Sequence, residues 1–129
     1  MIRNKAQVQD YLLEKLKNSS SDILDVAVVS EEGLILFSTS KNHMFRDMVA
    51  AHSASIFKSA NKLANDFLFE GMSFVVVCGK KKNMYLREIG KNQLLAVLVK
   101  SGAKWDALQA EIAKASNDLQ YIINMKEKL

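Results

Sequence analysis

Hydrophobic and polar positions along the chain follow helical and strand periods in turn. In residues 4–18, Val8, Leu12 and Leu16 recur every four positions among polar and charged residues, which predicts an amphipathic helix. A last helix is predicted from Trp105, where apolar residues recur at alternating intervals of three and four. Its stripe consists of Trp105, Leu108, Ile112, Ala115, Leu119 and Ile122.

Five short apolar runs between these helices predict strands. They span residues 23–29, 34–37, 72–78, 84–89 and 93–100. Glu31-Glu32-Gly33 supplies turn residues between the first two runs, so residues 23–39 predict a hairpin. The later runs are apolar without alternation, which indicates a sheet covered on both faces. Short turns between the runs favour antiparallel neighbours.

A long helix is predicted over residues 45–69, with Ser40 or Asn42 as its cap and Gly71 just past its end. One apolar stripe along it contains Phe45, Val49, Ile56, Leu63 and Phe67, and two further stripes add small residues and methionines. A single stripe would be enough to pack on one sheet. We therefore expect this helix to face both its own sheet and a partner.

The element order α-β-β-α-β-β-β-α indicates an α+β fold, an α/β/α three-layer sandwich built on a five-stranded antiparallel sheet. The long helix is expected on one face, with the N-terminal and C-terminal helices on the other. The length of 129 residues and the ordinary 49% of apolar residues fit one domain over residues 1–129. If the last strand lies beside the first, strand 72–78 becomes an edge.

An apolar edge strand without proline or charge invites aggregation unless another strand covers it. Pairing with a second copy of the chain would cover it by symmetry, and the small residues of helix 45–69 would let the two helices approach each other. The sequence thus predicts a homodimer through strand 72–78 and helix 45–69. The candidate interface residues are Phe74, Val76 and Cys78 in the strand and Met48, Ala51, Ser55 and Ser59 in the helix.

The net charge is only +4, but residues 80–91 account for all of it. These residues contain Lys80, Lys81, Lys82, Arg87 and Lys91 against Glu88, so 5 − 1 = +4. The favoured interpretation is a solvated turn. A contact with an acidic partner through Lys80, Lys81, Lys82 and Arg87 stays open as an alternative. Nucleic acid is not expected as a partner. Peripheral contact of this hairpin with a membrane stays open as an alternative, although it is not the expected one.

No residue pattern predicts catalysis, a metal or a cofactor. His43 and His52 lack further ligands at a suitable spacing, and no phosphate-binding loop or Gly-x-Ser-x-Gly turn occurs. The single cysteine, Cys78, excludes an internal disulfide. The longest dense apolar run, residues 94–99, is too short to span a bilayer. We expect a soluble, cytoplasmic protein that is not an enzyme.

Three stretches carry a resemblance to a known family. They are VAVVSEEGLILFS at 26–38, MVAAHSA at 48–54, and MYLREIG at 84–90 followed by LLAVLV and the final helix. In these, and in the order of its elements, the chain resembles the roadblock / dynein light-chain domain family.

The resemblance implies a non-catalytic homodimeric module that binds and regulates a small Ras-like GTPase, as some prokaryotic members do. The alternative that it implies is a structural adaptor subunit, dynein-light-chain-like or longin-like, without GTPase regulation. An arginine finger from Arg46 is a less favoured addition. A sensor of PAS-like architecture, with a small-ligand pocket between sheet and helix, is a further hypothesis.

Overall fold

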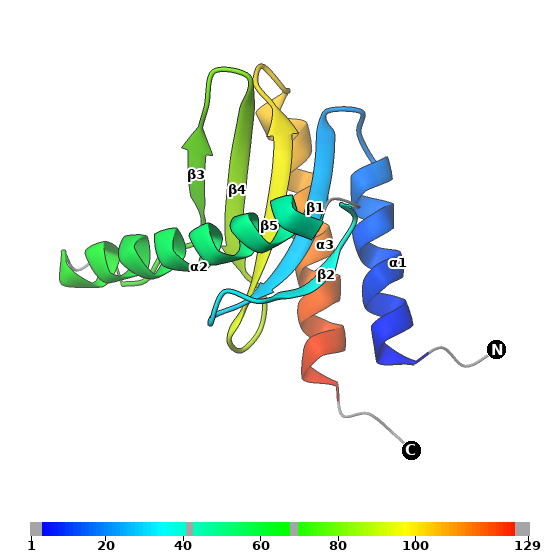
Figure 1. Ribbon diagram of the computed structural model, residues 1–129, viewed down its shortest axis with the longest axis horizontal. Coiled ribbons are helices and arrows are strands. Elements are labelled where there is room, and N and C mark those ends of the chain that lie inside the picture. The colour runs from blue at the N-terminus through cyan, green and yellow to red at the C-terminus, as the bar shows by residue number, and fades with distance from the viewer. Residues whose placement is uncertain (1–3, 41–42, 68–69, 126–129) are drawn as a thin grey trace.

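The computed structural model describes residues 4–40, 43–67 and 70–125 (Figure 1). Three helices and five strands follow one another in the predicted order, which confirms the α+β class. Their bounds are α1 (Lys5–Asn18), β1 (Ile23–Ser30), β2 (Ile35–Ser38), α2 (His43–Asp66), β3 (Val75–Cys78), β4 (Lys82–Glu88), β5 (Gln93–Lys100) and α3 (Trp105–Asn124).

The five strands form one antiparallel sheet in the order β2-β1-β5-β4-β3. The last strand in the sequence thus lies between β1 and β4, as predicted. Because β5 pairs along its length with β1 on one side and with β4 on the other, β2 and β3 lie at opposite edges of the sheet. The prediction that the third strand is an edge is therefore confirmed.

The sheet has helices on both faces, so the three-layer prediction is confirmed (Figure 1). On one face, α1 and α3 lie against each other, and α1 also lies against β1. Their core with the sheet includes Leu13, Leu16, Val26, Val28, Tyr85, Leu95, Val97, Ile112 and Leu119. On the other face, α2 crosses the strands and packs on Val29, Leu86, Leu94 and Ala96 through Ala50 and Phe57.

Polar contacts cap α1 at its start and link it to the end of α3. The Asn4 side chain accepts a hydrogen bond from the Gln7 backbone N–H at 2.8 Å and so caps α1. At the far end of α3, Lys5 Nζ donates to the carbonyl oxygens of Ile123 (2.9 Å) and Met125 (3.1 Å). A cation at a helix C-terminus satisfies free carbonyl groups and complements the helix dipole, so Lys5 ties α1 to α3.

Strand boundaries around the β3–β4 turn differ from the prediction. β3 begins at Val75 rather than at residue 72. β4 begins at Lys82, two residues earlier than predicted, because the Gly79 N–H donates to the Lys82 carbonyl oxygen at 2.9 Å and closes a tight turn. Lys82 therefore lies in β4 rather than in the turn before it.

The end of the long helix also differs. α2 ends at Asp66, and the Phe67 N–H still donates to the Leu63 carbonyl oxygen at 3.2 Å. Residues 68–69, where the helix was predicted to end, and the candidate cap Asn42 lie outside the described residues. Gly71 has φ of +110° but follows the helix at a distance of several residues.

The turn between β1 and β2 packs against the middle of α2. Gly33 has φ of +90°, and a Cβ atom at this position would lie 3.3 Å from the Ala51 Cα atom. A side chain at this position would therefore be disfavoured twice, by the left-handed backbone conformation and by its close contact with α2. Glycine thus allows this turn to close against α2.

Replacing Gly33 by alanine should lower the free energy of unfolding by about 2–3 kcal/mol, since strain and contact add. The matched control is Gly102→Ala, because Gly102 has φ of +83° but nothing within 4 Å of its added Cβ. We expect a loss of about 1 kcal/mol for the control. Urea unfolding measures both, and equal losses would contradict the contact with α2.

Candidate interaction surface

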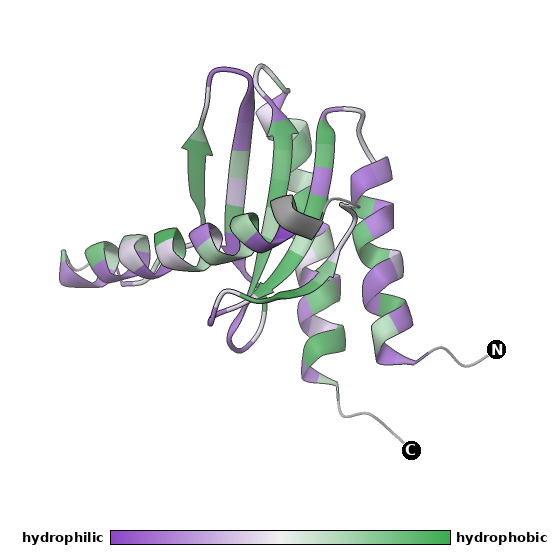
Figure 2. Ribbon diagram, viewed as in Figure 1, coloured by the Kyte–Doolittle hydropathy of each residue, from purple (hydrophilic) through white to green (hydrophobic). Residues whose placement is uncertain are grey.

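The two edges of the sheet are built differently. Between Val28 and Val29 the β1–β2 register shifts, so Leu36 of β2 has no partner in the ladder. A bulge of this kind disrupts further pairing and is a common protection of an edge. β3 instead pairs with β4 in unbroken register, and it is apolar along its length (Figure 2). The β3 edge therefore has neither a bulge nor a charge to prevent pairing.

An apolar groove lies beside this edge on the α2 face. It is lined from the helix by Met48, Val49, His52, Ser53 and Ile56, and from the strands by Val77, Met84 and Leu86. We call these residues the α2 groove. Val77 is 43% exposed and Met48 is 56% exposed. Apolar side chains gathered beside an open edge strand are typical of a protein-interaction site.

The exposed apolar stripe continues along α2 beyond the sheet. Figure 1 shows the C-terminal part of α2 extending past β3. Ile56, Leu63 and Phe67, which were predicted in one stripe with Phe45 and Val49, are all exposed here. We call the last residues of α2 together with Phe67, residues 63–67, the overhang. It carries apolar side chains that the chain's own sheet does not cover.

The helix residues predicted for the dimer are all solvent-exposed. Met48, Ala51, Ser55 and Ser59 are exposed on α2, and Met48 also lines the α2 groove. Their exposure agrees with the expected role, which stays a prediction.

The strand residues predicted for the dimer do not share a face with those helix residues. Phe74 and Val76 pack against the core of α1 and α3, on the opposite side of the sheet. The Phe74 ring stacks on Tyr85 with a centroid distance of 5.0 Å and lies 6.4 Å from Trp105. Only Cys78 is exposed. Phe74 and Val76 are therefore partly buried against the core, and their place in a dimer interface stays a prediction.

The residue on the groove side that the sequence reasoning missed is Val77. Side chains alternate along a strand, so Val75 and Val77 face α2 when Phe74 and Val76 face α3. On the helix, Ile56 and Leu63 were predicted in one apolar stripe, but no face was assigned to that stripe. The steps of four from Met48 to His52 and Ile56 could have pointed to the groove side.

The four basic residues predicted to contact an acidic partner lie in two different places. Lys80, Lys81 and Lys82 lie together at the β3–β4 turn, whereas Arg87 lies near the other end of β4. Arg87 is half-buried and lines a polar cleft with Ser73, Glu88, Lys91, Gln120 and Asn124. The structure therefore brings together three of the four residues proposed for an acidic partner.

A metal site and a closed ligand cavity under α2 can be examined among the described residues. Among them, no group of three or more His, Cys, Asp or Glu side chains is arranged to hold a metal ion. The cavity under α2, lined in part by Asp25 and Arg46, has a volume of about 20 Å³. That volume holds about one water molecule, so this cavity gives no support to a metabolite sensor. Arg46 is half-buried beside it rather than extended to the surface.

A family model of the Roadblock/LC7 domain matches residues 9–99. The chain belongs to the Roadblock/LC7 domain family. None of the curated proteins matches the sequence. No helix in the described ranges is long and apolar enough to cross a membrane.

Solved structures share this fold at low sequence identity. The Roadblock/LC7 domain from Streptomyces avermitilis has a TM-score of 0.84 at 20% identity, over 90% of this chain and 98% of that one. Myxococcus xanthus MglB has a TM-score of 0.83 at 18% identity, over 100% and 98%. A structure of MglB with a tetrameric arrangement has a TM-score of 0.83 at 17% identity, over 95% and 92%. At these identities the likeness shows the fold alone.

A core-facing residue just before β3 and an exposed residue at its end can be compared by mutation. Phe74→Ala should lower the free energy of unfolding by about 2–3 kcal/mol, because it removes a half-buried ring from the aromatic stack. Cys78→Ala, at an exposed position at the end of β3, should change it by less than about 0.5 kcal/mol. Chemical denaturation provides the measurement, and a stable Phe74→Ala variant would place this ring outside the core.

Proposed function

We propose that this member of the Roadblock/LC7 family is a non-catalytic homodimer that binds and regulates a small Ras-like GTPase. The observation that carries the dimer is the unprotected β3 edge beside the α2 groove, with the overhang of α2 next to both. The GTPase is proposed from the family resemblance.

Antiparallel pairing of β3 with the β3 of a second copy would account for the open edge, the α2 groove and the overhang. Two identical strands that pair in this way are related by a two-fold axis perpendicular to the sheet. The sheets of both copies then join into one, and both α2 helices lie on the same face. Because α2 extends past β3, the overhang of each copy lies toward the α2 groove of the other. Leu63 and Phe67, which are 56% and 66% exposed, would then lose contact with water.

Self-association is also supported by the contrast between the two edges. The bulge at Leu36 leaves the β2 edge a poor template for pairing, while β3 has a regular ladder on one side and open backbone groups on the other. The tetrameric arrangement of MglB, a protein of the same fold, adds that this fold can assemble into oligomers.

Placing a charge at Val77 should separate the dimer, since a carboxylate would be buried in the joined edge without a partner. We expect Val77→Glu to elute as a folded monomer in size-exclusion chromatography with light scattering. Leu36→Glu is the matched control, because Leu36 is 41% exposed and Val77 is 43% exposed, but on opposite edges. The control should stay dimeric. A dimeric Val77→Glu variant would exclude pairing through β3.

GTPase binding can be tested with purified small GTPases from the same organism, loaded with GDP or with a non-hydrolysable GTP analogue. We expect one of them to bind at tens of micromolar or tighter and to prefer one nucleotide state. Isothermal titration calorimetry measures both affinities. Binding to none of them would overturn the GTPase proposal. Equal affinity for both nucleotide states would favour the structural adaptor instead.

A further inference from the structure

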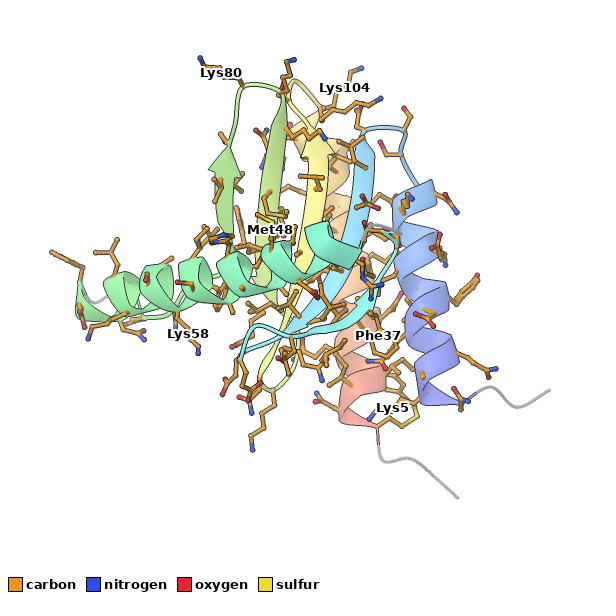
Figure 3. All side chains as sticks on the ribbon, in the orientation of Figure 1. Lys5, Phe37, Met48, Lys58, Lys80 and Lys104 are labelled. Atoms are coloured by element: carbon orange, nitrogen blue, oxygen red, sulfur yellow. The ribbon has the colours of Figure 1, made fainter. Side chains whose placement is uncertain are left out.

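Five lysines from separate segments gather at one end of the sheet. Lys80, Lys81 and Lys82 occupy the β3–β4 turn and the first position of β4, and Lys82 is paired with Lys100 at the end of β5. Lys104 precedes α3 at the same end, where Figure 3 shows its side chain and that of Lys80. We call these five residues the basic end.

Hydrogen bonds hold the segments of the basic end in place. The Ser101 N–H donates to the Lys81 carbonyl oxygen at 3.0 Å, and Ser101 Oγ donates to the Lys80 carbonyl oxygen at 3.1 Å. The Lys100 N–H donates to the Asp22 carbonyl oxygen at 2.9 Å. The lysine side chains are therefore presented by a connected backbone.

Most of the charge of the basic end is not neutralised by the protein. All five lysines are exposed, and among the described residues none of them lies within 4.0 Å of a carboxylate. Asp22 and Asp106 are the acidic residues on the segments that meet there, so the local sum is 5 − 2 = +3. Glu31, Glu32 and Glu88 lie at the other end of the sheet.

We propose that the basic end binds the surface of a bilayer that contains anionic lipids. Lysine acts as a point charge without the fixed geometry of arginine, which suits a fluid layer of headgroups. None of the three cavities described above is lined by these lysines, which lie on the exposed surface of the described residues. A cluster of four to eight basic side chains is the number typical of contact with anionic lipid.

Two charge variants test this contact by co-sedimentation with vesicles. Wild-type protein should bind vesicles that contain phosphatidylserine, bind phosphatidylcholine vesicles poorly, and be released by salt. The variant Lys80→Gln/Lys81→Gln/Lys82→Gln should lose about a hundredfold in binding, at about tenfold or less for each lysine.

The matched control is Lys58→Gln/Lys91→Gln/Lys114→Gln, which reaches the same net charge of 4 − 3 = +1 from exposed positions on other parts of the molecule. It should keep nearly all of the binding. Equal losses in both variants, or no binding of the wild type to phosphatidylserine at low salt, would overturn the proposal. Binding of polyglutamate but not of vesicles would assign the basic end to an acidic protein and would also overturn it.

The geometry of the bound protein rests in addition on the proposed dimer. A two-fold axis perpendicular to the sheet turns the basic ends of the two copies in opposite directions. One dimer should therefore link two vesicles, and light scattering should rise when protein is added. Val77→Glu should bind the vesicles but not link them. Binding without linking by a wild-type dimer would contradict the orientation of the two copies, whereas the absence of binding would overturn the lipid contact alone.

Discussion

The position of β5 between β1 and β4 is the constraint on which the rest of the molecule depends. Its side chains are buried on both faces, with Leu95 and Val97 toward α1 and α3 and with Leu94 and Ala96 toward α2. A strand of this kind is stable only in the middle of a sheet. Its position makes β2 and β3 the edges, and it brings the loop after β5 against the β3–β4 turn. The open edge and the basic end therefore have the same topological origin.

The order of elements, the layers and the edge position of the third strand could be predicted because each depends on local patterns and short turns. The face to which the side chains of β3 point could not be predicted. Residues 74–78 are apolar throughout, so they have no alternation, and only the register with β4 directs Phe74 toward Tyr85 and Val77 toward α2. The exposure of Ile56 and Leu63 depends on how α2 crosses the sheet, which helical spacing does not contain.

The grouping of the charged side chains in space could not be predicted from the sequence either. The basic residues of 80–91 are contiguous in the sequence, but β4 is seven residues long and separates the two ends of this segment by roughly 20 Å. Lys91 and Arg87 thus leave the cluster. Lys100 and Lys104 join it, because Ser101 is hydrogen-bonded to the β3–β4 turn. Contacts between residues distant in the sequence decide which charges act together.

Charge and symmetry favour the same arrangement of the proposed dimer. If the β3 strands paired in parallel, the two basic ends would lie side by side, and their unneutralised lysines would repel one another within about one Debye length. Antiparallel pairing moves them to opposite ends of the joined sheet. There, each basic end shares a side of the dimer with the opposite end of the other copy, where Arg87 and Lys91 stand against Glu31, Glu32 and Glu88, so the charge beside it is 2 − 3 = −1 rather than +3. The arrangement that covers the open edge is thus also the one that lowers the electrostatic cost of association.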